Sequence, residues 1–113
     1  MAKTLLCRQV LASEGGPVII ADVSVVPLGV GTSVSAYVKK AVKALDASGL
    51  KVLHGPMSTS LEAKTVDEVF SAVKKAHDAV IAAGAKRVVT TLKLDDRRDK
   101  DHTMASKLSA IDR

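Results

Sequence analysis

The loop at residues 27–36, VPLGVGTSVS, carries residue types that bind anions in many strand-to-helix loops. Gly29 and Gly31 precede the hydroxyls of Thr32 and Ser33, and a helical apolar pattern follows. Free backbone N–H groups, two hydroxyls and the positive end of a helix dipole together favour an anion or a polar acceptor. In a purely structural interpretation, Thr32 or Ser33 caps the helix while the glycines supply turn conformations. The sequence leaves both interpretations open.

The sequence lacks the signatures of nucleotide binding, hydrolysis and metal transport. No third glycine completes G-x-G-x-x-G, and no G-K-[ST] follows the loop. No nucleophile elbow is present, and the loop has no cysteine pair to hold a soft metal ion. RNA stacking needs aromatic residues on central strands, and the strands expected there have none. We therefore expect a protein that is not an enzyme and uses no metal or cofactor.

His77 needs separate consideration because it lies on an apolar helical stripe, four residues after Val73 and four before Ile81. A lone histidine in such a place is more often a packed, hydrogen-bonded residue than a ligand. No further His, Cys or carboxylate stands at metal-ligand spacing from it, and His54 and His102 are isolated. We interpret His77 as a structural residue.

The composition is that of one globular domain. Of the 113 residues, 47% are hydrophobic and 26% charged, and the net charge is +5 with both signs interspersed. Cys7, the single cysteine, cannot form an internal disulfide, which suits a reducing compartment. No apolar run approaches the ~20 residues of a membrane span. We expect a cytoplasmic protein with no membrane partner.

The hydrophobic periodicity predicts four strands and three helices. The pattern opens with a β-branched run, and we expect Pro27 to end this first strand. Thr65 and Glu68 form the capping box of the second helix. A short apolar stripe at Met104, Leu108 and Ile111 predicts a final helix. The expected strands lie at 18–26, 50–54, 57–63 and 86–94, and the two longer helices at 34–45 and 66–81.

The order β-α-β-β-α-β predicts an α+β ferredoxin-like sandwich, in which a four-stranded antiparallel sheet carries two helices on one face. The first and third strands are central in this topology, and the cationic last strand suits an edge. Residues 18–113 would form this domain together with the short C-terminal helix. Residues 1–17, set apart by a Gly-Gly-Pro break, would form an irregular N-terminal arm, with a short targeting segment as the alternative.

Three stretches resemble, in order and spacing, the small thiamine-binding protein family. They are SVVPLGVGTS at 24–33, Ala76-His77, and RVVTTLKLDDRRDK at 87–100, within a likeness that runs from about Ile20 to Lys100. The resemblance implies a ferredoxin-like fold, a dimer of dimers, and binding of thiamine or its hydroxymethylpyrimidine moiety without catalysis. The alternative is an oligomeric interaction or regulatory domain with no thiamine role.

Polar residues on the expected strands and in the loop are candidates for contacting such a ligand. An aminopyrimidine has donors and acceptors on one edge and a flat apolar face, so its site needs polar groups beside apolar ones. The alternative for each strand residue is cross-strand hydrogen bonding within the sheet, and the sequence leaves open which face lines a pocket. The candidates are Ser24, Thr32, Ser33, Thr59, Thr91 and Lys93.

The tail KLDDRRDK, at 93–100, mixes four cationic with three acidic side chains. Nucleic-acid binding gains from uninterrupted positive charge, so the acids speak against a nucleic-acid partner. Mixed signs instead suit Arg–carboxylate pairs, within one subunit or across a symmetric interface. We expect Arg97 and Arg98, with Asp95 and Asp99, to organise a homo-oligomer, most simply a tetramer, and Lys93 to point towards the ligand.

Overall fold

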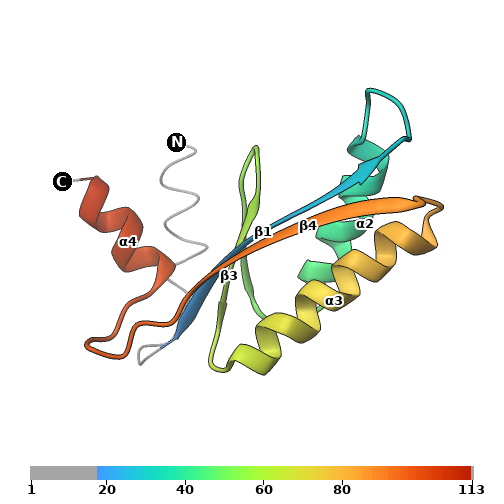
Figure 1. Ribbon diagram of the computed structural model, residues 1–113. Coiled ribbons are helices and arrows are strands. Elements are labelled where there is room, and N and C mark those ends of the chain that lie inside the picture. The colour runs from blue at the N-terminus through green and yellow to red at the C-terminus, as the bar shows by residue number, and fades with distance from the viewer. Residues whose placement is uncertain (1–17, 113) are drawn as a thin grey trace.

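The computed structural model describes residues 18–112, and the predicted N-terminal arm at 1–17 lies outside this range. The four strands form one antiparallel sheet in the order β2-β3-β1-β4, and α2 and α3 pack against the same face of it (Figure 1). This is the predicted ferredoxin-like α+β architecture. The elements are β1 (Ile19–Leu28), α2 (Ser35–Asp46), β2 (Lys51–His54), β3 (Thr59–Ala63), α3 (Val66–Ala82), β4 (Arg87–Asp95) and α4 (Met104–Ile111).

The positions of the strands follow from their residue patterns. The β-branched strand β1 is central, as predicted, with β3 on one side and β4 on the other. Its odd-numbered residues, from Ile19 to Val25, are buried against α2 and α3, whereas Asp22 and Ser24 on the other face are half-buried. β4 alternates between exposed and half-buried residues, as an edge strand with one solvent-facing side should. The predicted central and edge strands are therefore confirmed.

The main core lies between the sheet and the two long helices. Leu61 of β3 and Leu45 of α2 are among its most buried side chains, and α3 contributes a full apolar stripe. The chain has two aromatic residues, and of these only Tyr37 borders the core. Small aliphatic side chains therefore fill it. The buried residues of α3 are Val69, Ala72, Val73, Ala76 and Val80.

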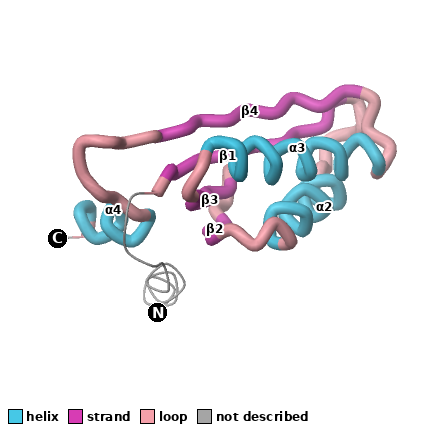
Figure 2. The backbone as a smooth tube through the Cα atoms, turned by 90° about the horizontal axis from the view of Figure 1, so that it is seen from below, coloured by secondary structure: helices cyan, strands magenta, loops and turns pink. Residues whose placement is uncertain are grey.

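α4 packs on the opposite face of the sheet, at one end of it (Figures 1 and 2). Met104 is buried against Ile20 of β1, and its backbone N–H donates to the carboxylate of Glu62 on β3. Lys107 Nζ lies 2.9 Å from Asp95 Oδ2 at the end of β4. The final helix therefore docks on its own domain and covers only part of this face. None of the helices within residues 18–112 is long and apolar enough to cross a membrane.

The start of α2 differs from the prediction. The N-cap residue is Val34, with no side-chain cap hydrogen bond, and Thr32 and Ser33 are exposed in the preceding loop. The expectation that Thr32 or Ser33 caps the helix was therefore wrong. The chain uses two left-handed glycines to leave β1, Gly29 at φ +79° and Gly31 at φ +100°, so the helix begins after both hydroxyls. The turn role of the glycines is confirmed.

Pro27 does not end the first strand, contrary to the prediction. It pairs in register with Val88, and β1 continues to Leu28. A proline is tolerated here because, among the residues that the structure describes, β1 pairs only with β4 beyond Val23, so the missing N–H of Pro27 can face the other side. The capping box of α3 is confirmed, since Glu68 N–H donates to Thr65 Oγ1 at 3.1 Å and Thr65 N–H donates back to Glu68 Oε1 at 3.0 Å.

Candidate functional site

The unequal lengths of β1 and β3 create an opening in the fold. β1 has ten residues and β3 has five, and the ladder between them stops at the pair Val23–Thr59. Over Ser24–Leu28, β1 pairs only with β4, and no described residue forms a ladder with its other side. We call the main-chain side of Ser24–Leu28 that points away from β4 the free edge of β1.

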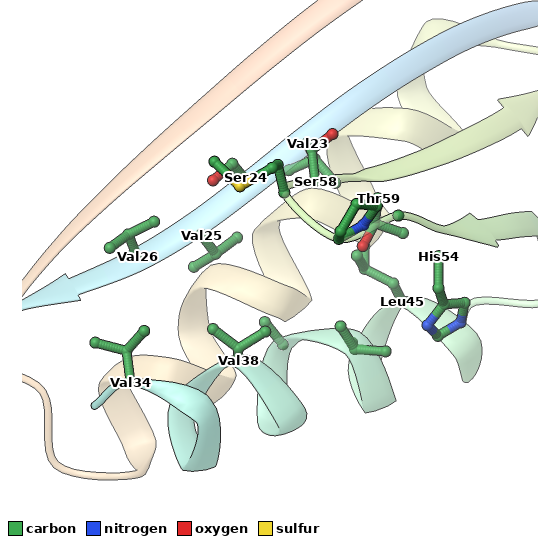
Figure 3. A pocket seen from close by; sticks show the side chains of 15 residues that line it. Val23, Ser24, Val25, Val26, Val34, Val38, Leu45, His54, Ser58 and Thr59 are labelled. Carbon is green, nitrogen blue, oxygen red and sulfur yellow. The ribbon is translucent and has the colours of Figure 1, made fainter. Parts of the chain in front are cut away.

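A pocket of about 250 Å³ lies beside this free edge. Its first wall is β1 from Val23 to Val26, its second wall is one side of α2, and its third is the hairpin from His54 to Thr59 (Figure 3). Val25 on β1 and Val38 on α2 lie across the pocket from each other (Figure 3). The α2 wall is entirely apolar and consists of Val34, Val38, Ala41, Val42 and Leu45.

The β2–β3 hairpin is held firmly over the pocket. Gly55 N–H donates to the carbonyl of Ser58 at 2.9 Å, and a Cβ on Gly55 would lie 2.8 Å from that carbonyl oxygen, so the turn requires glycine. Ser58 Oγ donates to Asp22 Oδ1 at 2.7 Å, which ties the hairpin to the central strand. At the start of the hairpin, His54 Nε2 lies 2.8 Å from Asp46 Oδ1 at the end of α2. The pocket therefore has a preformed wall.

The predicted ligand residues fall into three places. Ser24 and Thr59 line the pocket together. Thr91 and Lys93 lie on β4, opposite Ser24 and Asp22, on the sheet face away from α2 and α3. The loop residues Thr32 and Ser33 are exposed and do not line the pocket.

A polar cluster surrounds Asp22 on that second face. Asp22 Oδ1 accepts hydrogen bonds from Ser58 and, at 3.3 Å, from Ser60. Lys93 stands opposite Asp22 on β4, as a direct cross-strand partner. Ser60 thus makes a cross-strand hydrogen bond within the sheet, and Ser58 connects this cluster to the pocket.

Several pocket residues were missed in the sequence because they look like core residues or turn residues. The valines of α2 fit the stripe of a buried helix, yet Val38 is 37% exposed because β3 stops short in front of it. Met57 lies in the hairpin with 87% of its surface exposed, whereas the sequence pattern predicts that it begins a strand. The Gly55-Pro56 break was the one sequence signal of a turn here, and it does not reveal a pocket.

His77 has the structural role expected from the sequence. Its Nδ1 lies 2.7 Å from Thr90 Oγ1, so the ring shares a hydrogen bond between α3 and β4. Thr90 faces the core side of β4 and is not among the residues that line the pocket. Within residues 18–112 no group of three His, Cys, Asp or Glu side chains is placed to hold a metal ion.

The arginines of the tail form ion pairs with near neighbours in the chain. Arg97 binds both carboxylate oxygens of Asp99, at 2.7 and 3.0 Å, and Arg98 Nη2 lies 2.9 Å from Asp96 Oδ2. The hydrogen bonds from Arg97 lower the pKa of Asp99 to about 2. Lys107 likewise lowers the pKa of Asp95 through a hydrogen bond. Both pairs lie within one subunit, and the expected role of the two arginines in an oligomer stays a prediction.

The comparisons with known proteins agree with this architecture. The family described as "Thiamine-binding protein" matches residues 21–112. A UPF0045 protein of Methanothermobacter thermautotrophicus is 47% identical over 94 residues, covering 82% of this chain and 95% of that protein. The UPF0045 protein YqgV of Bacillus subtilis is 39% identical over 99 residues, covering 83% of this chain and 94% of that protein.

Solved structures show the same fold. A hypothetical protein of Methanocaldococcus jannaschii superposes with a TM-score of 0.78 at 44% identity, covering 86% of this chain and 98% of that one. A Thermotoga maritima structure described as a thiamine biosynthesis/salvage protein superposes with a TM-score of 0.72 at 24% identity, covering 84% and 99%. The protein is thus a small ferredoxin-like α+β domain with a pocket beside its central strand. It belongs to the thiamine-binding protein family.

Proposed function

We propose that the protein binds thiamine or its hydroxymethylpyrimidine moiety, and that it does so in the pocket beside the free edge of β1. The observation that carries the proposal is the make-up of this pocket, whose apolar walls surround a few polar groups from Ser24, Ser58 and Thr59. A flat heteroaromatic ring needs that combination of apolar walls and sparse polar groups. The family membership and the description of the Thermotoga maritima relative support the choice of thiamine chemistry.

The size of the pocket supports one ring rather than a large ligand. Pockets for drug-sized ligands span roughly 300–1,000 Å³, and this one is about 250 Å³. A pyrimidine ring fits this space, and the thiazolium of thiamine would then extend towards solvent. The proposal accordingly treats the pyrimidine as the recognised part.

We propose binding without catalysis. In the described pocket, the one hydroxyl bonded to a carboxylate is that of Ser58, and its partner Asp22 also accepts from Ser60. No third group is aligned with them as a base or acid among the described residues, unlike the sets that activate nucleophiles. The ligand would be carried, sensed or buffered as it is.

We also propose that the protein is a cytoplasmic homo-oligomer, most simply a dimer of dimers. Apolar side chains remain on the sheet face that α4 leaves uncovered, with Val89 45% and Leu28 39% exposed. Burying such surface against a second copy would be favourable. Light scattering at micromolar concentration tests this, and a monomer there would contradict it.

Thermal-shift measurements with thiamine, hydroxymethylpyrimidine and unrelated heterocycles test the binding proposal. A ligand that binds only the folded state raises the melting temperature by mass action. The variant Val38→Trp should fill the pocket and abolish the shift. Ile81→Trp, which introduces the same side chain at an exposed α3 position outside the pocket, should retain it.

Two outcomes would contradict the proposal. If neither thiamine nor hydroxymethylpyrimidine stabilises the protein, the interaction or regulatory domain becomes the better description. If both ligands stabilise Val38→Trp as well as the unchanged protein, a ligand site exists elsewhere.

A further inference from the structure

We propose that the main chain of Val25 selects the ligand, by pairing its N–H and C=O with the adjacent acceptor and donor of an aminopyrimidine. This inference rests on the proposed function and specifies how the same pocket would select its ligand class. It follows from the alternation of main-chain direction along the strands, in which successive residues direct their N–H and C=O groups to opposite neighbouring strands.

The β2–β3 hairpin shows which residues direct their main-chain groups to which neighbouring strand. The hydrogen bond from Gly55 N–H to Ser58 C=O makes these two residues face each other across the turn. Facing pairs in an antiparallel ladder alternate between hydrogen-bonded and non-hydrogen-bonded, so the even-numbered residues of β3 direct their main-chain groups to β2. The odd-numbered residues Thr59, Leu61 and Ala63 must then direct theirs to β1.

The same alternation continues across β1. Thr59 pairs with Val23, so Val23 directs its N–H and C=O towards β3, and Ser24 directs its own towards β4. Val25 points its main-chain groups to the β3 side again, where the ladder has already ended. Pro27, two residues further, has the same orientation, which explains why a residue without an N–H is tolerated there.

Val25 therefore presents one main-chain donor and one main-chain acceptor at the free edge of β1. The side chain of Val25 lines the adjoining pocket (Figure 3). None of the described residues forms a ladder with β1 at this point. Main-chain groups that no described strand pairs, lying beside an apolar pocket, favour a partner that supplies the complementary donor and acceptor. A 4-aminopyrimidine has a ring nitrogen that accepts and an adjacent amino group that donates.

The walls around Val25 suit the faces of such a ring. Val38 and Val42 from α2 and Met57 from the hairpin surround the pocket with aliphatic and thioether groups. These groups contact a flat ring without competing for its hydrogen-bonding edge. The inferred ligand class is therefore a flat heteroaromatic amine with an acceptor next to its amino group.

Amide hydrogen exchange measured by NMR on the full chain tests the inference directly. Without ligand, the Val25 N–H should exchange much faster than the Val23 N–H, which is paired with β3. Saturating hydroxymethylpyrimidine should slow exchange at Val25 by about tenfold or more beyond the slowing that general stabilisation of the folded state produces at Val23. The desamino analogue, which lacks the donor for the Val25 carbonyl, should bind at least about tenfold more weakly.

A backbone variant gives a second measurement. Val25→Pro removes the N–H of Val25, which faces the pocket, and leaves every N–H that pairs with β4 in place. Pro27, two residues later, already shows that β1 accepts a proline in this orientation. Val25→Pro should fold and lose most of its affinity for hydroxymethylpyrimidine, whereas Val88→Pro, which removes an outward-facing N–H of the edge strand β4 outside the pocket, should keep most of it. If Val25→Pro does not fold, the exchange experiment on the unchanged chain decides.

The outcomes separate this inference from the proposed function. If hydroxymethylpyrimidine raises the melting temperature but Val25 exchange does not change, or if the desamino analogue binds equally well, main-chain recognition is wrong and the binding function stands. If Val25 is already protected without ligand, another chain covers the free edge and the inference is also wrong. If hydroxymethylpyrimidine and thiamine produce no shift at all, the proposed function itself fails.

Discussion

Ser58 and Asp22 lie 36 positions apart in the chain, and the hydroxyl of Ser58 donates to Asp22 Oδ1 at 2.7 Å. This hydrogen bond joins the tip of the β2–β3 hairpin to the central strand β1. Because the hairpin forms one wall of the pocket, the contact helps to keep the pocket open and in shape. The second hydroxyl on the same carboxylate oxygen, that of Ser60, is at 3.3 Å and so is the weaker donor.

Ser58→Ala should lower both stability and ligand affinity. A hydrogen bond to a charged group contributes about 1.5–3 kcal/mol, and partial exposure of this one reduces the expected loss of unfolding free energy to about 1–2 kcal/mol. Chemical denaturation and a ligand titration measure the two effects. The matched control Ser60→Ala should cost less in both, and an equal or larger effect of Ser60→Ala would contradict this account.

The caps of the two long helices should respond differently to mutation. Thr65→Ala removes the capping box of α3 and should lower the free energy of unfolding by about 1 kcal/mol. The double variant Thr32→Ala, Ser33→Ala should change it by less than about 0.5 kcal/mol, since neither hydroxyl caps α2. Urea denaturation compares them, and a large loss of unfolding free energy in the double variant would restore a capping role for the loop.

The contact between His77 and Thr90 should stabilise the fold without affecting the ligand. Thr90→Val keeps the side-chain shape, removes the hydrogen bond at 2.7 Å, and should cost about 1 kcal/mol. A double-mutant cycle with His77→Leu should give a coupling energy of similar size. Ligand titrations of the same variants should be unchanged, and a marked loss of affinity would show that His77 serves the site after all.

The pair Arg97–Asp99 predicts a particular acid titration. The pKa of Asp99 is lowered from 3.8 to about 2, so the stabilisation is complete above the unfolded value of 3.8 and is lost as the pH falls through about 2. Both groups are largely exposed, so the effect on global stability should be small. NMR titration of the Asp99 carboxyl carbon measures this directly.

Arg97→Ala is the control for that titration, and it should return the Asp99 pKa towards 3.8. If Asp99 titrates near 3.8 in the unchanged protein, Arg97 does not lower its pKa and this account is wrong. The same variant also tests the expected part of Arg97 in oligomer assembly, because a lower oligomeric state by light scattering would follow from that expectation.

Local patterns in the sequence were sufficient to predict the element order and the fold class. The 3.6-residue stripe of α3, the capping box at Thr65, and the β-branched run of β1 each follow from interactions among close neighbours in the chain. Right-handed crossovers then leave few ways to fold that order. The packed role of His77 was likewise apparent from its place on the apolar stripe of α3.

The pocket was decided only by the tertiary structure. Its existence depends on where β3 stops pairing with β1, at Val23–Thr59, and on the Ser58–Asp22 contact across 36 positions. Strand register and length are set by the packing of distant segments, and a shift of one residue moves every side chain to the other face. The sequence named Ser24 and Thr59 correctly as polar strand residues. It could not separate them from Thr91 and Lys93, because the face and the edge on which a strand residue lies are properties of the assembled sheet and not of its neighbours in the chain.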